Sequence, residues 1–121
     1  CVLRIDYLGR SVLLCGDIEG QAMGRLIASR ASLGTDIIVA PHHGSYSPNL
    51  NKFMGRVSPE YVVVSAERKK LGYYDSPGKV LSTSQSGAIS LTIGKGGVRV
   101  NEYLPYTLPA GEGRTTRVIA Q

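Results

Sequence analysis

The spacing of hydrophobic and polar positions changes several times along the chain, and each change predicts an element. Residues 2–7 alternate, residues 8–11 have the composition of a turn and residues 12–15 are a short apolar run, so the chain opens with a predicted hairpin. Apolar residues then recur at helical spacing until a glycine. This predicts a helix that starts at Asp17 or just after it and stops at Gly34. We expect Asp17, or the residue that follows it, to cap this helix.

Two continuous apolar runs lie in the middle of the chain. Residues 36–40 and 61–65 are almost wholly apolar, which is typical of strands that are buried on both faces. Residues 48–57, between these runs, predict a short helix with one apolar side. After a polar loop at residues 66–76, we expect a further helix from Pro77, because proline is favoured in the first helical turn.

The last part of the chain predicts a second hairpin and then a tail. Residues 88–93 and 98–104 flank a Gly-Lys-Gly-Gly turn. Residues 105–121 are rich in Pro, Gly and Thr without periodicity, which indicates a tail or linker. Strands that alternate with helices predict one α/β layered domain over residues 1–104, and the two hairpins predict that its sheet is mixed.

Composition and charge add little to this picture. The 121 residues, 42% hydrophobic and 19% charged, are ordinary for a globular domain, and no run approaches the roughly 18 apolar residues of a spanning helix. The opening lacks the pattern of a signal peptide, and because it starts at Cys1 within a predicted strand we expect a piece of a longer protein. Cys15 is expected to be buried and unreactive on its strand. The net charge of +5 suits an anionic partner such as nucleic acid, but Lys and Arg are scattered.

Asp17, His42 and His43 are the residues best placed to carry chemistry. Asp17 follows one predicted strand, and the two histidines follow the next strand along the chain. Ligands of layered α/β sheets gather at the carboxyl ends of strands, and carboxylate with imidazole is a common ligand set for zinc, iron or manganese. The alternatives are structural: a helix cap for Asp17 and a hydrogen-bonded residue at a strand end for each histidine. Spacing alone leaves both interpretations open.

Two longer motifs resemble a known family. Leu-Leu-Cys-Gly-Asp-Ile-Glu-Gly at residues 13–20 and Asp-Ile-Ile-Val-Ala-Pro-His-His-Gly-Ser-Tyr-Ser at residues 36–47 resemble the metallo-β-lactamase superfamily. More narrowly, they resemble the ComEC-type hydrolase domain of competence proteins that internalise DNA. The resemblance covers residues 2–104 and implies that the chain is the C-terminal half of a metallo-β-lactamase αββα sandwich.

The resemblance implies roles for four residues. Asp17 matches the carboxylate that bridges two divalent metal ions, zinc or manganese, and His43 matches the last histidine ligand. His42 would lie beside the metals as a catalytic or substrate-binding residue. Ser45 would position a phosphate, although a local hydrogen bond to the backbone is the simpler expectation.

The sequence departs from the family pattern at two places. The principal metal motif, His-x-His-x-Asp-His, would lie before Cys1, so we expect the chain alone to bind metal weakly or not at all and to be inactive. Members of the resembled family carry Tyr-Gly-His-Pro in the loop after the strand that corresponds to residues 61–65. Here residues 72–77 stand in that loop, with Asp75 near the position of the histidine. Asp75 is therefore a candidate substrate-binding residue.

The parent protein is expected to be a phosphodiesterase or nuclease that acts on DNA during competence uptake. One alternative is another hydrolase of the superfamily, acting on a lactone, thioester or phosphocholine ester. A second is a non-catalytic DNA-docking or structural module. Without the preceding half of the domain, apolar surface should be exposed, so a homodimer is also expected. A ComEC-like protein would place this domain outside the cytoplasm, attached to a membrane protein.

Overall fold

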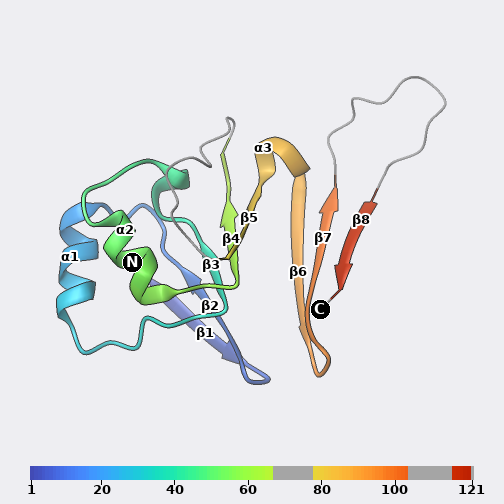
Figure 1. Cartoon of the computed structure of the whole chain (residues 1–121), viewed down its shortest axis with the longest axis horizontal. Helices are drawn as coiled ribbons and strands as arrows, with labels where there is room; N and C mark the ends of the chain where they lie inside the picture. The colour runs from blue at the N-terminus through green and yellow to red at the C-terminus, as the bar shows by residue number, and fades with distance from the viewer. Residues whose placement is uncertain (67–77, 104–115, 121) are drawn as a thin grey trace.

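The computed structural model describes residues 1–66 and 78–103 in full and residues 116–120 as backbone; these residues form two β-sheets and a layer of two helices (Figure 1). The five-stranded sheet has the order β1-β2-β3-β4-β5, with strands Leu3–Tyr7, Arg10–Leu14, Ile37–Val39, Tyr61–Val64 and Lys79–Ser82. The three-stranded sheet has the order β6-β7-β8, with strands Ala88–Gly94, Gly97–Tyr103 and Thr116–Ala120. The helices are α1 Gly20–Ala28, η1 Pro41–Gly44 (a 3-10 helix), α2 Leu50–Val57 and α3 Thr83–Ser86.

The five-stranded sheet is mixed, as the sequence predicted. β1 and β2 form an antiparallel hairpin, and β2, β3, β4 and β5 run parallel to one another. The turn of the hairpin is Leu8-Gly9, where both residues have positive φ, 47° and 76°. Two-residue hairpin turns with this backbone match the twist of the strands, and a glycine at one position reduces the strain.

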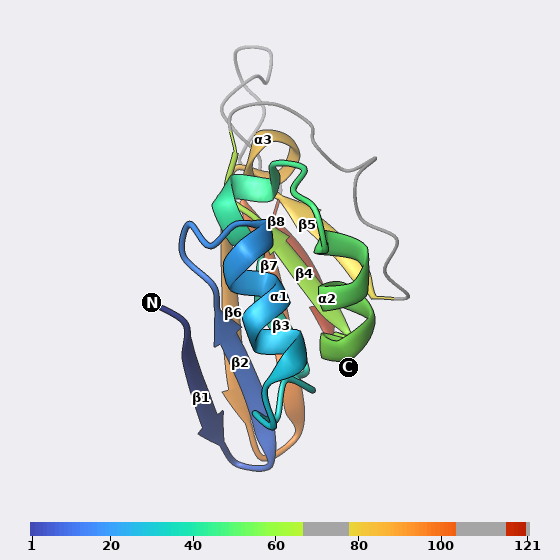
Figure 2. The same cartoon turned by 90° about the vertical axis from the view of Figure 1, so that its left-hand side faces the viewer.

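Helices α1 and α2 cover one face of the five-stranded sheet (Figure 2). In α2 the apolar residues recur at positions i, i+3, i+4 and i+7, so that all of them fall on one side of the helix and are buried: Leu50, Phe53, Met54 and Val57. α1 lies close to the start of α2, because Gly20 has no side chain. A Cβ at Gly20 would lie 2.7 Å from the carbonyl oxygen of Pro48.

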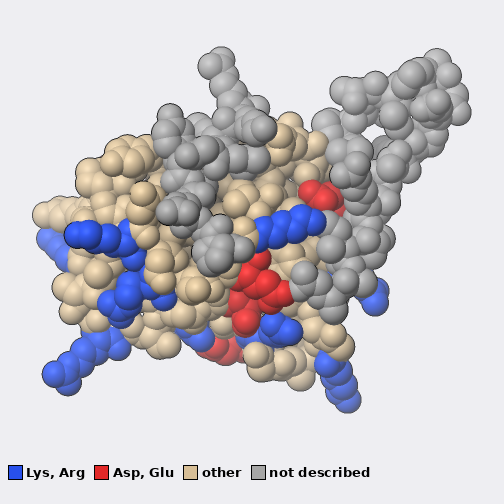
Figure 3. Space-filling view, in the orientation of Figure 1, with Lys and Arg blue, Asp and Glu red and all other residues tan. Residues whose placement is uncertain are grey.

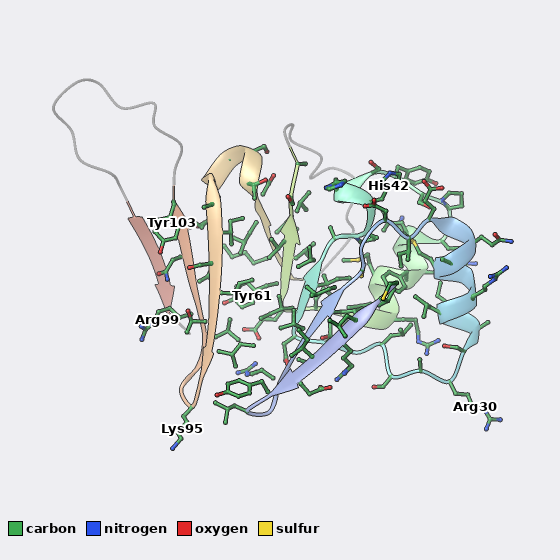
Figure 4. The ribbon with its side chains drawn as sticks, turned by 180° about the vertical axis from the view of Figure 1, so that it is seen from behind. Arg30, His42, Tyr61, Lys95, Arg99 and Tyr103 are labelled. Atoms are coloured by element: carbon green, nitrogen blue, oxygen red, sulfur yellow. The ribbon has the colours of Figure 1, made fainter. Side chains whose placement is uncertain are left out.

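The three-stranded sheet packs against the other face of the five-stranded sheet. Ile37, Tyr61 and Val63 point to this side and meet Val98 and Val100 of β7. Their neighbours along the strands, Ile38, Val62 and Val64, point to the helices. β3 and β4 are thus buried on both faces, which confirms the prediction from their continuous apolar runs. Figure 4 shows Tyr61 between the two sheets.

Four details differ from the prediction. First, α1 starts at Gly20 and ends at Ala28; Glu19 occupies the N-cap position without a side-chain hydrogen bond, so Asp17 is not a cap. Second, the predicted helix from Pro77 is wrong within the described residues, because Lys79–Ser82 is a strand and only Thr83–Ser86 is helical. Gly78 runs so close to the carbonyls of Pro59 and Glu60 that a Cβ would clash, and the amide of Lys79 donates to the Glu60 carbonyl at 2.8 Å.

Third, the hairpin of β6 and β7 forms a separate sheet and does not extend the first one. Fourth, residues 116–120, which the sequence placed in a tail, form β8 and pair antiparallel with β7. The predicted loop at residues 66–76 lies outside the described residues except for Ala66. No helix in the described part of the chain has the length and apolar character to cross a membrane.

Candidate functional site

The carboxyl ends of β2 and β3 bring Asp17 and the two histidines together. The two strands are parallel neighbours with Leu14 opposite Val39, so the segments that leave them start side by side. The amide of His42 donates to the carbonyl of Gly16 at 2.8 Å, which ties the two segments beyond the sheet. Figure 4 shows His42 at this end of the sheet, away from the turn of the β6-β7 hairpin at Lys95.

The backbone of this site is left-handed at four positions. Gly16 and Gly44 have φ of 57° and 80°, while His42 and His43 have 48° and 53°. Glycine adopts such angles freely, but each histidine costs about 1–2 kcal/mol in this region. Strained residues of this kind persist where surrounding contacts fix them, and they cluster at functional sites. The η1 turn therefore holds two consecutive histidines in a conformation that the fold must stabilise.

His43 is fixed by a hydrogen bond on the side of its ring opposite Asp17. Its Nδ1 lies 3.0 Å from the carbonyl oxygen of Ser65, which follows β4. A carbonyl only accepts, so Nδ1 carries the proton in this contact. Nε2 lies 3.6 Å from Oδ1 of Asp17. Histidines that bind metals are commonly oriented by such a bond from the other ring nitrogen to a backbone carbonyl.

The separation of Asp17 and His43 fits two ligands of one metal ion. Two atoms that are each about 2.0–2.1 Å from zinc in tetrahedral geometry lie roughly 3.4 Å apart. The side chains are 73% and 63% exposed, so the pair has an open side. As an ion pair at this exposure it would contribute little to stability. Within the described residues no group of three or more His, Cys, Asp or Glu side chains comes together that could hold a metal ion.

His42 has a different partner. Its Nδ1 lies 3.1 Å from Oε1 of Glu19, the residue before α1. The two acidic residues thus alternate along one segment, Asp17 facing His43 and Glu19 facing His42. The sequence alone predicts no role for Glu19 at the site. Its only signal was its place in the Gly-Asp-Ile-Glu motif, two residues after Asp17.

Ser45 and Asp75 were the other predicted substrate-binding residues. The amide of Ser45 donates to the carbonyl of His42 at 2.9 Å, which closes the η1 turn. This bond involves the amide of Ser45, so the roles expected of its hydroxyl stay predictions. Asp75 lies outside the described residues.

A shallow hollow lies beside the histidine turn. Its volume is about 180 Å³, and it is lined by Tyr46, Ser47, Asn49, Leu50, Asn51 and Lys52. Asn49, one of the lining residues, donates from Nδ2 to the carbonyl of Gly20 at the start of α1 at 3.0 Å. An aromatic ring, amides and an ammonium group therefore stand next to the candidate site.

Cys15 precedes the site but takes no part in it. The residue is fully buried, and both cysteines are free. Burial raises the pKa of the Cys15 thiol to about 12, so the thiolate that binds metals is absent at neutral pH. The burial confirms the expectation of a buried cysteine, and its lack of reactivity stays a prediction.

Comparisons with known proteins give one informative match. No family model matches the chain, and no solved structure does. The chain is 31% identical over 122 residues to "Competence protein ComA" of Neisseria gonorrhoeae. The match covers 88% of this chain but 17% of that protein. The chain is therefore similar over most of its length to one part of a much longer competence protein.

Proposed function

We propose that this chain is part of a metal-dependent phosphodiesterase that cleaves DNA during competence uptake. The similarity to a competence protein over 88% of the chain supports a role in DNA uptake. The resemblance of the motifs around Asp17 and His43 to the metallo-β-lactamase superfamily supports the hydrolytic chemistry. In this proposal the chain is the C-terminal half of the catalytic domain.

The geometry of Asp17 and His43 is the observation that carries the proposal. The carbonyl of Ser65 holds Nδ1 of His43, and Nε2 faces the Asp17 carboxylate at 3.6 Å. Asp17 and His43 would hold a divalent cation, zinc or manganese, and Asp17 would also contribute to holding a second one. When bound, such ions supply a hydroxide-like nucleophile at neutral pH and a positive field for the phosphoryl oxygens.

His42 and Glu19 would handle the proton of the reaction. Because Nδ1 of His42 is next to the Glu19 carboxylate, Nε2 is the ring atom left to face a substrate. A carboxylate on one nitrogen orients the ring, as in acid–base pairs of other hydrolases. We assign His42 the transfer of a proton to the leaving oxygen, or a hydrogen bond to a phosphoryl oxygen. Glu19 is then a positioning residue that acts through His42.

Because the positive charges are dispersed, contacts with an anionic substrate would come from single side chains and not from a continuous basic stripe. Lysine and arginine side chains are dispersed over the face in Figure 3, around a central group of acidic side chains, and form no continuous stripe. The net charge of +5 still favours an anionic substrate. Lys52 and Tyr46 in the hollow beside the histidine turn are suited to a phosphate and a base of a single strand.

A substrate panel on a protein extended at its N-terminus tests the proposal. With zinc or manganese it should cleave a single-stranded oligonucleotide and a simple phosphodiester such as bis(p-nitrophenyl) phosphate. The extended His43→Ala variant and the 121-residue chain should cleave neither. Hydrolysis restricted to a lactone, thioester or phosphocholine ester would refute the substrate class. Salt-sensitive DNA binding without cleavage would refute catalysis in favour of a docking module.

A further inference from the structure

The edge strand β1 exposes an unusual amount of apolar surface. Leu3, Ile5 and Tyr7 are 52%, 44% and 57% exposed, and they alternate along the strand, so all three lie on one face. Their partners on β2 are Leu14, Val12 and Arg10. Val12 packs into the core between the two sheets. Leu3, Ile5 and Tyr7 thus form an apolar stripe that extends this core toward the edge of the sheet. Figure 2 shows β1 at the outer edge, beyond β6 of the second sheet.

The opposite face of β1 is polar and anchored. Arg4 pairs with Asp6 on the same strand at 2.9 Å, and it also donates to the carbonyls of Ser32 and Gly34 after α1. These bonds hold the Arg4 face of the strand toward the segment after α1, so the apolar stripe stays on the opposite face. Natural edge strands are usually protected by lysine, proline or a bulge. β1 has none of these on its apolar face.

The outward edge of β1 offers backbone groups for pairing. In the strand order β1 stands at the end of the sheet, and within the described residues only β2 pairs with it. A hairpin closed by a two-residue turn has its hydrogen-bonded pairs at every second residue from the turn, here Tyr7, Ile5 and Leu3. The amides and carbonyls of Arg4 and Asp6 then point away from β2.

The sequence of β1 is complementary to itself in antiparallel register. When the strand is paired with a second copy about Ile5, Arg4 faces Asp6 of the other copy, and Asp6 faces its Arg4. On the other face Leu3 faces Tyr7 and Ile5 faces Ile5. The register therefore puts opposite charges together twice and apolar side chains together three times, and cross-strand pairs of both kinds stabilise sheets. The outward backbone groups of Arg4 and Asp6 would form the hydrogen bonds.

We propose that β1 is a homotypic docking strand, which joins two copies of this chain by antiparallel β1–β1 pairing centred on Ile5. The occupant of the edge is a second copy, because its charges match in this register. The two five-stranded sheets become one continuous sheet across a two-fold axis. A five-residue strand gives a small interface, so the dimer should be weak and concentration-dependent.

A charge-exchange experiment tests the pairing directly. Arg4→Glu makes both charged positions acidic, and Asp6→Arg makes both basic. Each variant alone should dimerise roughly tenfold less than the wild-type chain, because two like-charge pairs replace two opposite pairs. An equimolar mixture of the two variants should form a heterodimer, because each acidic position of one variant then faces a basic position of the other. Sedimentation velocity over a concentration series measures all four samples, and circular dichroism confirms that each variant is folded.

Further variants keep the test decisive if Arg4→Glu unfolds through loss of its bonds to Ser32 and Gly34. Ile5→Lys puts two ammonium groups together at the centre and should give a monomer. Tyr103→Lys changes an equally exposed residue on the second sheet and should leave the dimer unchanged. A wild-type chain that stays monomeric at all concentrations overturns the proposal. So does an N-terminally extended protein that is monomeric yet protects the amides of Arg4 and Asp6 from hydrogen exchange, since an internal segment would then hold the edge.

Discussion

His43 presents Nε2 to Oδ1 of Asp17 at 3.6 Å, while the carbonyl of Ser65 engages its other ring nitrogen. Three separate strands contribute to this relationship, because Asp17, His43 and Ser65 follow β2, β3 and β4. These strands are parallel neighbours, so their carboxyl ends meet at one edge of the sheet. The fold thus fixes both the distance between Asp17 and His43 and the hydrogen bond at Nδ1, an arrangement that a metal-binding histidine would need.

Strain at the histidine turn should lower the free energy of unfolding, and a substitution that relieves the strain should raise it. His42 has a φ of 48°, which glycine tolerates and alanine does not. We expect His42→Gly to be more stable than His42→Ala by about 0.5–1 kcal/mol, after the greater freedom of glycine in the unfolded chain is allowed for. Urea unfolding of both variants gives the difference. Equal stabilities, or a more stable alanine variant, would mean that the turn is not strained at this residue.

Substitution of Glu19, which we propose to orient His42, should affect the kinetics differently from substitution of the proposed metal ligands. Glu19→Gln in an N-terminally extended protein should lower kcat by at least about tenfold with little change in KM or metal content, because Glu19 orients His42. Glu60→Gln, which changes a carboxylate paired with Arg10 far from the histidine turn, is the matched control. A parallel loss of metal in Glu19→Gln would instead make Glu19 a ligand.

The buried hydroxyl of Tyr61 offers a test of the core between the sheets. Its oxygen has no hydrogen-bond partner in the described part of the structure, and the ring is fully buried. A buried, unpaired polar group costs about 1–3 kcal/mol, so Tyr61→Phe should raise the free energy of unfolding by about 1 kcal/mol. Tyr103→Phe, at an exposed tyrosine, should change it by less than about 0.5 kcal/mol. Destabilisation by Tyr61→Phe would reveal a partner for the hydroxyl, such as a buried water.

Cys15 should make the chain less stable at high pH. Its folded-state pKa is about 12, against 9.0 for a free thiol, so the folded state holds the proton more tightly than the unfolded state. The contribution of Cys15 to the free energy of unfolding is then constant below pH 9.0 and falls as the pH rises from 9.0 toward 12. The Cys15→Ala variant should show a smaller fall than the wild-type chain in denaturant titrations.

The same burial predicts selective thiol chemistry. Iodoacetamide should label the exposed Cys1 in the folded chain and reach Cys15 after unfolding. Mass spectrometry of labelled peptides distinguishes the two sites. Rapid labelling of Cys15 under native conditions would show that the end of β2 opens readily.

Residues with a strong local signal were predicted well from the sequence. The continuous apolar runs of β3 and β4 indicated strands buried on both faces, and the i, i+3, i+4, i+7 spacing from Leu50 indicated α2. The meeting of Asp17 with the histidines was also predictable, because the ends of neighbouring parallel strands lie together.

Features that depend on long-range contacts were not predictable. Pro77 favoured a helix by local propensity, but parallel pairing of Val80 with Val62 makes the segment a strand. The separation of β6 and β7 into a second sheet depends on packing of Val98 and Val100 against Tyr61, which no spacing reveals. The contact of Glu19 with His42 depends on side-chain rotamers and on the left-handed turn, so the motif alone could not show it.

In our proposal, Asp17 and His43 are ligands of a metal centre that this chain completes only together with further residues. Elemental analysis and zinc titration of the 121-residue chain and of an N-terminally extended protein test it most directly, with Asp6→Asn as a control for an exposed carboxylate outside the site. We predict about two ions per molecule in the extended protein, their loss in His43→Ala and Asp17→Asn, and weak or no binding by the short chain. Tight, stoichiometric binding by the short chain, or full metal content in extended His43→Ala, would contradict the account.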